Sequence, residues 1–170
     1  AENGFWRISS DRRRRPLRQM CRIFPTMKKG SSLRHRAAGS RRALDPVGPV
    51  DGRIATGLER PDIFNWFRHV RDESREKRAR ALVLMFGGND DHGFMTGLPE
   101  GKDLDGFGGE LWTAEYRRRV GGIMDTVTRA GAVLVWIGLP ITRDLDQTAR
   151  FDTINAIAQT EAEKRQRRVS

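Results

Sequence analysis

The stretch from Ala81 to Asp90 (ALVLMFGGND) is the feature of the sequence that most constrains the fold. Six apolar residues follow one another without polar alternation and lead into two glycines, an asparagine and an aspartate. An uninterrupted apolar run of this length is typical of a parallel strand that is covered on both faces in an α/β protein. Because open α/β sheets bind ligands outside the carboxyl ends of their strands, the GGND sequence marks a candidate site.

Helical patterns and a second strand surround this run. An apolar stripe after Pro61 predicts a short helix, and a longer stripe predicts a second helix from Gly109 or Glu110 to Gly131. A glycine-rich loop over residues 93–109 precedes the second helix and borders the candidate site. A second strand is predicted over residues 132–139, stopping at Pro140, followed by a last helix that Asp144 or Asp146 caps. The order helix, strand, helix, strand, helix predicts parallel strands joined by crossover connections.

The positive charge of the chain is confined to its first 45 residues. The net charge is +10, and residues 1–45 contain thirteen Lys or Arg against three Asp or Glu, whereas the remainder is balanced. Proline, glycine and serine interrupt this basic segment, and it shows no helical or strand period, so we expect a disordered tail at 1–45 and an α/β domain at 46–170. Such a tail can bind nucleic acid weakly and without sequence preference. The alternatives are a solvated tail or sequence outside the folded gene product.

The sequence carries no apolar run suited to a secretory signal or a membrane span. Cys21 is the sole cysteine, which excludes an internal disulfide. The sequence indicates neither the compartment nor the oligomeric state, and it predicts no cofactor. Asp90, Asp91 and His92 are suitable metal ligands by type, but adjacent residues in a tight loop rarely converge on one ion. We therefore expect no metal site, an ordinary surface histidine at His69, and Arg119 close enough to the apolar stripe to reach back toward the cleft.

The GGND sequence resembles the G-x-N-D block of the SGNH (GDSL-type) hydrolases, with matches at Gly87, Asn89 and Asp90. Four further segments are similar to a bacterial branch of that superfamily known as a domain of unknown function: ATGLERPDIFNW, the W-x-x-x-Y-x-x-R-V pattern from Trp112, VLVWIGLPITRD and INAI. The resemblance covers roughly residues 53–162. It implies a three-layer, flavodoxin-like α/β fold with a parallel sheet and flanking helices. It also implies hydrolysis of small-molecule or glycan esters, often in the cell envelope, by proteins that are often exported.

The resemblance also implies roles for individual residues. Asn89 matches the oxyanion-hole asparagine, and Gly57 matches the oxyanion-hole glycine, while Gly87, Gly88 and Asp90 border the substrate. In such enzymes a serine attacks the ester carbonyl and a histidine, oriented by an aspartate, removes the serine proton. The G-D-S block of the serine and the D-x-x-H block of the histidine are both absent from this sequence.

We therefore expect an incomplete domain from a truncated or frame-disrupted member of the superfamily that is inactive alone. Two alternatives remain. One is a non-catalytic module that binds a glycan or acyl ligand, and the other is a nucleic-acid binder that acts through residues 1–45.

Overall fold

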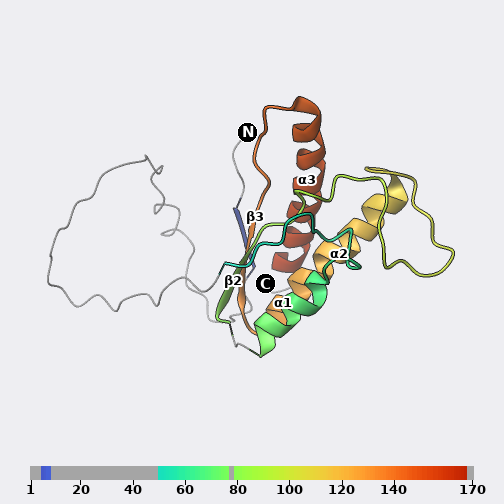
Figure 1. Ribbon diagram of the computed structural model, residues 1–170. Helices are drawn as coiled ribbons and strands as arrows, with labels where there is room; N and C mark the ends of the chain where they lie inside the picture. The colour runs from blue at the N-terminus through green and yellow to red at the C-terminus, as the bar shows by residue number, and fades with distance from the viewer. Residues whose placement is uncertain (1–4, 9–49, 77–78, 168–170) are drawn as a thin grey trace, which may run out of the picture. The chain divides into compact units, whose positions relative to one another are not determined.

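The fold is described from a computed structural model over residues 5–8, 50–76 and 79–167 (Figure 1). Strands and helices alternate along the chain in one folding unit. In chain order they are β1 (Phe5–Ile8), α1 (Trp66–Arg75), β2 (Ala81–Leu84), α2 (Glu110–Arg129), β3 (Val133–Ile137) and α3 (Leu145–Arg167). The rest of the predicted basic tail, residues 1–4 and 9–45, lies outside the described residues, so its disorder and its nucleic-acid binding stay predictions.

The sheet has the strand order β1-β3-β2. Strand β2 runs parallel to β3, with Ala81 opposite Val133, and α2 makes the connection between them, as the sequence predicts. Strand β1 pairs antiparallel with β3, with Phe5 opposite Ile137. This edge strand lies within residues 1–45, the segment that the sequence predicts to be mostly disordered. Its four residues are too few to show a period in the sequence, and only pairing with β3 defines them as a strand.

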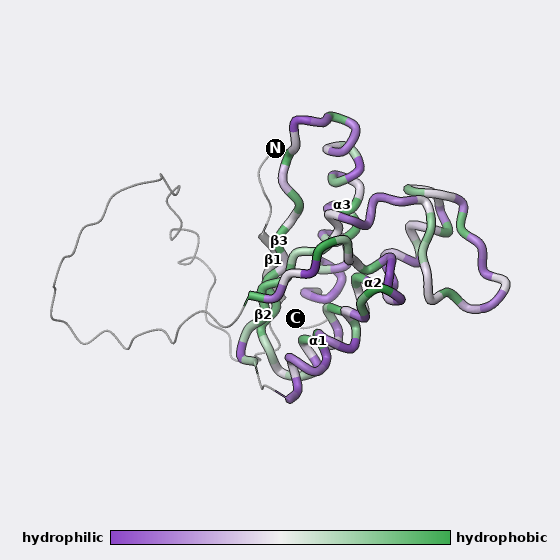
Figure 2. Tube along the Cα trace, viewed as in Figure 1, coloured by the Kyte–Doolittle hydropathy of each residue, from purple (hydrophilic) through white to green (hydrophobic). Residues whose placement is uncertain are grey.

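Helix α2 forms the centre of the core. It contacts α1, α3 and β3, and α3 also contacts β1. The buried residues Val120, Ile123 and Val127 of α2 share one apolar cluster with Leu134 and Trp136 of β3. Figure 2 shows the corresponding pattern, since hydrophobic segments follow the strands whereas hydrophilic and hydrophobic positions alternate along the helices. None of the helices in the described part of the chain has both the length and the apolar character needed to cross a membrane.

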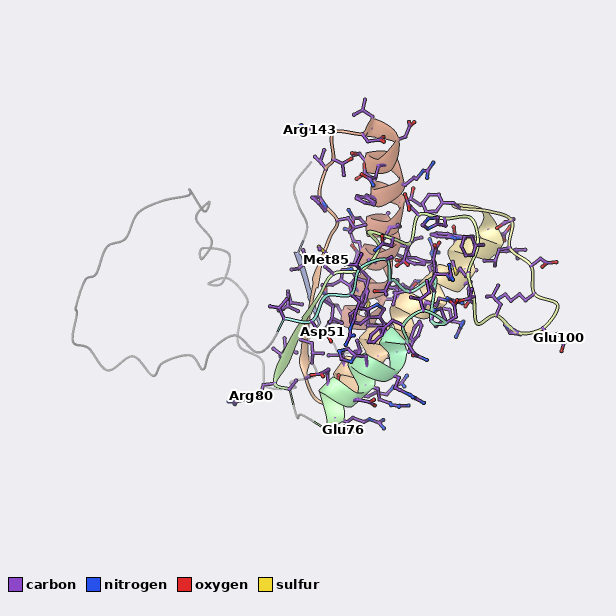
Figure 3. All side chains as sticks on the ribbon, in the orientation of Figure 1. Asp51, Glu76, Arg80, Met85, Glu100 and Arg143 are labelled. Atoms are coloured by element: carbon purple, nitrogen blue, oxygen red, sulfur yellow. The ribbon has the colours of Figure 1, made fainter. Side chains whose placement is uncertain are left out.

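Strand β2 is covered on one face only, which corrects the expectation of cover on both faces. Leu82 and Leu84 are partly buried against the core, whereas Val83 is 63% exposed and Met85 is 57% exposed. Met85 is labelled in Figure 3. An apolar run does not reveal which of its side chains meet a partner, because both faces carry the same residue type. The described residues thus form an incomplete α/β fold with a sheet and the helices that contact it.

Helix α1 begins at Trp66, five residues later than the predicted start at Pro61. The side chain of Asn65 accepts a hydrogen bond from the backbone N–H of Arg68 at 2.9 Å and so caps the helix. The residues from Pro61 to Ile63 form a turn instead, in which the Ile63 N–H donates to Arg60 O at 3.1 Å. Ile63 is 51% exposed and does not join the buried stripe.

Carboxylates cap the two longer helices. The Asp105 carboxylate accepts hydrogen bonds from the backbone N–H groups of Leu111 and Trp112, both at 3.0 Å, which fixes the predicted start of α2. Gly131 follows the end of α2 with a φ of 81°, a conformation that suits glycine. Asp144 Oδ1 accepts from the backbone N–H of Asp146 at 2.9 Å, so Asp144 is the cap of α3. The start and the end of α2 and the start of α3 all confirm the sequence prediction.

Candidate functional site

The loop after β2 turns sharply at Gly87. Its φ is +118°, and a Cβ atom there would lie 2.6 Å from a side-chain carbon of Ile154 and 2.8 Å from one of Leu139. Only glycine fits both the backbone conformation and the packing. Gly88 is exposed, and a Cβ atom there would meet no atom within 4 Å. Gly87 is therefore needed for the fold of the loop, while Gly88 leaves the surface beside the loop open.

Asp90 is fully buried and joins three parts of the chain. Its carboxylate accepts hydrogen bonds from the backbone N–H groups of Leu58 and Glu59, both at 3.0 Å, and from the Tyr116 hydroxyl at 2.9 Å. Burial raises the pKa of Asp90, and these three hydrogen bonds oppose that shift. Asp90 thus holds the loop of residues 56–60 against the end of β2 and against α2.

Gly57 and Asn89 meet at one peptide bond. A Cβ atom on Gly57 would lie 2.0 Å from Asp90 Oδ1, so the close approach of the carboxylate requires glycine. The exposed Asn89 side chain donates from Nδ2 to Thr56 O at 3.1 Å. Thr56 O and the Gly57 N–H belong to the same trans peptide and point to opposite sides of it. The structure therefore brings both predicted donors to the Thr56–Gly57 peptide, while the Asn89 hydrogen bond is made on its carbonyl side.

The residues before this peptide hold it in place. Thr56 Oγ1 accepts from Trp66 Nε1 at 3.0 Å and donates to Arg53 O at 2.8 Å. Ala55 has a φ of 57°, a left-handed conformation that is uncommon for a residue with a side chain. A strained residue next to a candidate site is consistent with a functional constraint on the loop.

Arg119 of α2 reaches back to the loops, as its place beside the apolar stripe suggested. It is 2% exposed, and its guanidinium donates to Leu58 O at 2.7 Å, Glu59 O at 3.2 Å and Thr96 O at 2.6 Å. Its Nε also donates to Glu115 Oε1 at 2.8 Å. One buried cation therefore satisfies three backbone carbonyls while an ion pair within α2 balances its charge.

Glu59 is a second buried carboxylate that sequence reasoning missed. It is 0% exposed, and its Oε1 accepts from Trp112 Nε1 at 3.0 Å. Burial and the nearby charge of Asp90 raise the pKa of Glu59 to about 8. A single glutamate after a glycine turn carries no signal of burial. The signal lies in the Trp112 side chain, which is 53 positions away and comes close only in the fold.

The three adjacent residues considered as metal ligands do not converge. Asp90 faces the interior, whereas the Asp91 carboxylate lies 3.6 Å from Arg150 Nη1, and the His92 side chain is 56% exposed. Within the described ranges, no group of three His, Cys, Asp or Glu side chains has an arrangement that could hold a metal ion. His69 lies on α1, with its Nε2 4.0 Å from Glu73 Oε1.

A groove of about 840 Å³ lies between α2 and α3, away from the loop after β2. Neither Gly57 nor Asn89 lines this groove. The lining combines basic and acidic side chains with small residues: Glu110, Thr113, Ala114, Arg117, Arg118, Gly122, Asp125, Glu161, Lys164 and Arg165. Asn89 therefore lies on an open part of the surface, outside this groove.

The described elements define an α/β protein with a polar loop cluster at the carboxyl end of a parallel strand. Residues 41–169 match the family described as "Protein of unknown function (DUF459)", and the chain belongs to this family. A comparison with curated proteins found no significant match.

Proposed function

We propose that this chain carries the oxyanion-binding part of an SGNH (GDSL-type) ester hydrolase site. The observation that carries the proposal is the hydrogen bond from Asn89 Nδ2 to Thr56 O at 3.1 Å, which places the amide beside the Gly57 peptide. The amide has a second N–H for a ligand, and the Gly57 N–H belongs to the same peptide but points to the side opposite the Asn89 hydrogen bond. Removing one such donor from an oxyanion hole typically costs about 3–4 kcal/mol of transition-state stabilisation. The GGND sequence and the DUF459 membership support this assignment.

The remaining predicted site residues fall into an exposed group and a buried group. Gly88 is exposed beside Asn89, and we assign it to the surface that a ligand approaches. Asp90 and Gly87 are buried, so in this proposal they position the donors and do not contact the ligand. The resemblance to SGNH hydrolases implies a small-molecule or glycan ester as the substrate class, and in this proposal the ester carbonyl oxygen is the atom that becomes the oxyanion.

The 170-residue chain does not supply the nucleophile in the pattern that such enzymes use. Residues 1–170 contain no Gly-Asp-Ser sequence, and no histidine follows His92. We therefore propose that this chain binds the carbonyl or carboxylate end of a ligand without turning over an ester. The alternative is a non-catalytic module that binds a glycan or acyl ligand. Such a module would bind its ligand in the same way, but it would not hydrolyse the ligand even when assembled with other chains.

Acetate, a small carboxylate, tests the binding step. In a two-dimensional NMR titration we expect the Asn89 side-chain amide and the Gly57 backbone N–H signals to shift together and to saturate. Because a hydrogen bond to a charged group contributes about 1.5–3 kcal/mol, Asn89→Ala should weaken acetate binding at least about tenfold. Asn65→Ala is the matched control, since it removes an exposed asparagine that caps α1. An acetate-induced shift of the Gly57 N–H signal that persists unchanged in Asn89→Ala would overturn the proposal.

A chromogenic short-chain ester tests the absence of turnover. The chain should hydrolyse the ester no faster than Asn89→Ala does. Turnover that Asn89→Ala abolishes would support the oxyanion role of Asn89 and contradict the inactivity of the 170-residue chain.

A further inference from the structure

Glu59 and His92 bring a buried carboxylate next to an exposed imidazole. Glu59 Oε2 is buried and makes no hydrogen bond of good geometry among the described residues, although the His92 backbone N–H lies close enough to the carboxylate to oppose the rise of its pKa. His92 Nδ1 lies 3.4 Å from this oxygen, and the His92 side chain is 56% exposed. A buried carboxylate oxygen without a partner is costly in a folded protein. Its position opposite one edge of an imidazole therefore calls for an explanation.

One hydrogen bond orients the carboxylate of Glu59, and two more hold its backbone. Its other oxygen accepts the Trp112 Nε1 hydrogen bond at 3.0 Å. Its backbone N–H donates to Asp90 Oδ1 at 3.0 Å, and its backbone carbonyl accepts from Arg119 at 3.2 Å. Rotation of the side chain would break the Trp112 hydrogen bond, so Oε2 stays directed at His92.

The contact determines which edge of the imidazole is accessible. Because Nδ1 faces the buried carboxylate, Nε2 lies on the opposite edge of a side chain that is more than half exposed. A neutral imidazole carries a proton on one nitrogen and a lone pair on the other, and the partner of one nitrogen decides the state of the second. An ionised Glu59 favours the proton on Nδ1 and thereby leaves the lone pair on Nε2.

We propose that Glu59 and His92 form a proton-transfer pair, in which Glu59 orients the imidazole and His92 Nε2 accepts a proton from the hydroxyl group of water or an alcohol. The O–H bond of the ligand breaks, its electron pair stays on the oxygen, and the new N–H bond forms at Nε2. The carboxylate of Glu59 then balances the imidazolium charge. Return of the proton from Nε2 to the same oxygen or to the solvent restores the pair. This inference goes beyond the proposed oxyanion function, since it uses neither Asn89 nor Gly57.

Other charged groups face this pair. Asp91 Oδ1 lies 3.8 Å from His92 Nδ1, and the Asp91 carboxylate is also 3.6 Å from Arg150. Asp90 is the second buried carboxylate near Glu59, and together with burial it raises the pKa of Glu59 to about 8. Because Glu59 is mostly ionised above this pKa, the measurements on the pair are made at pH 9.

The variant Glu59→Gln gives the sharpest test. Its side-chain oxygen keeps the Trp112 hydrogen bond, which turns its NH₂ group toward His92 Nδ1. Nδ1 then has to accept, so the ring proton moves to Nε2. Long-range ¹H–¹⁵N NMR spectra at pH 9 should show the Nδ1–H form of His92 in the wild type and the Nε2–H form in Glu59→Gln. The matched control is Glu73→Gln, which changes the carboxylate beside His69 and should leave the His92 spectrum unchanged.

Chemical modification supplies a second measurement. Carbethoxylation by diethyl pyrocarbonate requires a lone pair on the imidazole, and Glu59→Gln should slow the reaction of His92 several-fold at pH 9 while Glu73→Gln leaves it unchanged. Near-ultraviolet circular dichroism establishes that both variants are folded. The same His92 tautomer and the same rate in the wild type and in Glu59→Gln would overturn the proposal. Because acetate binding through Asn89 is measured separately, either proposal can fail while the other stands.

Discussion

The buried carboxylate of Glu59 predicts that the chain loses stability as the pH rises through the neutral range. Glu59→Gln is the perturbation that isolates this effect, because glutamine has almost the same shape and cannot ionise. The amide oxygen of the introduced glutamine can still accept the Trp112 hydrogen bond that Glu59 Oε1 accepts at 3.0 Å. The variant therefore removes the titration of the side chain and keeps its packing.

The magnitude follows from the pKa of Glu59. Burial and the charge of Asp90 raise it from 4.5 to about 8. At about 1.36 kcal/mol for each pKa unit, this shift corresponds to at most about 5 kcal/mol. Entry of water into the loop around Glu59 would lower this value, because hydration favours the charged form.

The direction follows from the proton that the folded state holds. A raised pKa means that the folded chain binds the proton of Glu59 more tightly than the unfolded chain does. The stabilisation is fully present below pH 4.5 and is lost as the pH rises through about 8. Groups whose pKa is lowered change the stability only at more acid pH. Glu115 is an example, because its arginine and lysine partners keep it ionised and lower its pKa. The comparison is therefore made between pH 5 and pH 9.

Urea unfolding followed by the fluorescence of the buried tryptophans measures the effect. At pH 5 we expect the unfolding free energies of the wild type and Glu59→Gln to agree within about 1 kcal/mol. At pH 9 the variant should be more stable by several kcal/mol, up to the limit of about 5 kcal/mol. Glu100→Gln is the control, since Glu100 is exposed in the loop between β2 and α2 (Figure 3). Parallel curves for the wild type and Glu59→Gln over this pH range would refute the reasoning.

Three further predictions concern the clamp that Asp90 forms and the basic tail. Asp90→Ala leaves three buried donors without an acceptor and should lower the unfolding free energy by about 3–5 kcal/mol. A loss below about 1 kcal/mol in urea unfolding would contradict the role of Asp90 as a clamp. Gly57→Ala should lower the melting temperature strongly, because its methyl group would lie 2.0 Å from Asp90. The control Gly122→Ala in α2 meets no atom within 4 Å and should stabilise the chain by about 0.5–1 kcal/mol. Similar effects of the two substitutions would exclude the steric reason. Replacing Arg12 to Arg15 by glutamine should reduce the salt dependence of binding to single-stranded DNA by about 0.7 in the log–log slope for each phosphate that is no longer neutralised, and an unchanged slope would count against the tail as a nucleic-acid binder.

The sequence predicted the elements that have strong local signals. The apolar stripe of α2 and the end of that helix before Gly131 were correct, and so was the parallel pairing of β2 with β3. The start of α1 was wrong because proline and aspartate suggested a first turn at Pro61, whereas the side chain of Asn65 caps the helix. Strand β1 was missed because its pairing with β3 is a contact between distant parts of the chain. Local patterns cannot show such contacts.

The candidate site divides in the same way. Asn89 and Gly57 were predicted from the resemblance to a motif; the hydrogen bond from Asn89 to Thr56 O brings Asn89 to the Thr56–Gly57 peptide, and the role of both residues as oxyanion donors stays a prediction. Arg119 was predicted to reach back because it lies one step from the apolar stripe. Glu59 carried no signal, since its burial depends on Trp112 and on its two buried neighbours, Asp90 and Arg119.

The Asn-Asp pair shows why adjacent motif residues need separate roles. Asn89 is exposed and its amide is directed at the Thr56 carbonyl, while Asp90 is buried and accepts two backbone N–H groups from the same loop. The aspartate thus fixes the loop against which the asparagine is placed, and Gly57 lets the carboxylate approach. If the proposed function is right, Asp90→Asn should weaken acetate binding through misplacement of Gly57 and not through loss of a ligand contact. The Gly57 N–H signal should then move even without acetate, whereas a spectrum that changes only on acetate addition would assign Asp90 to the ligand itself.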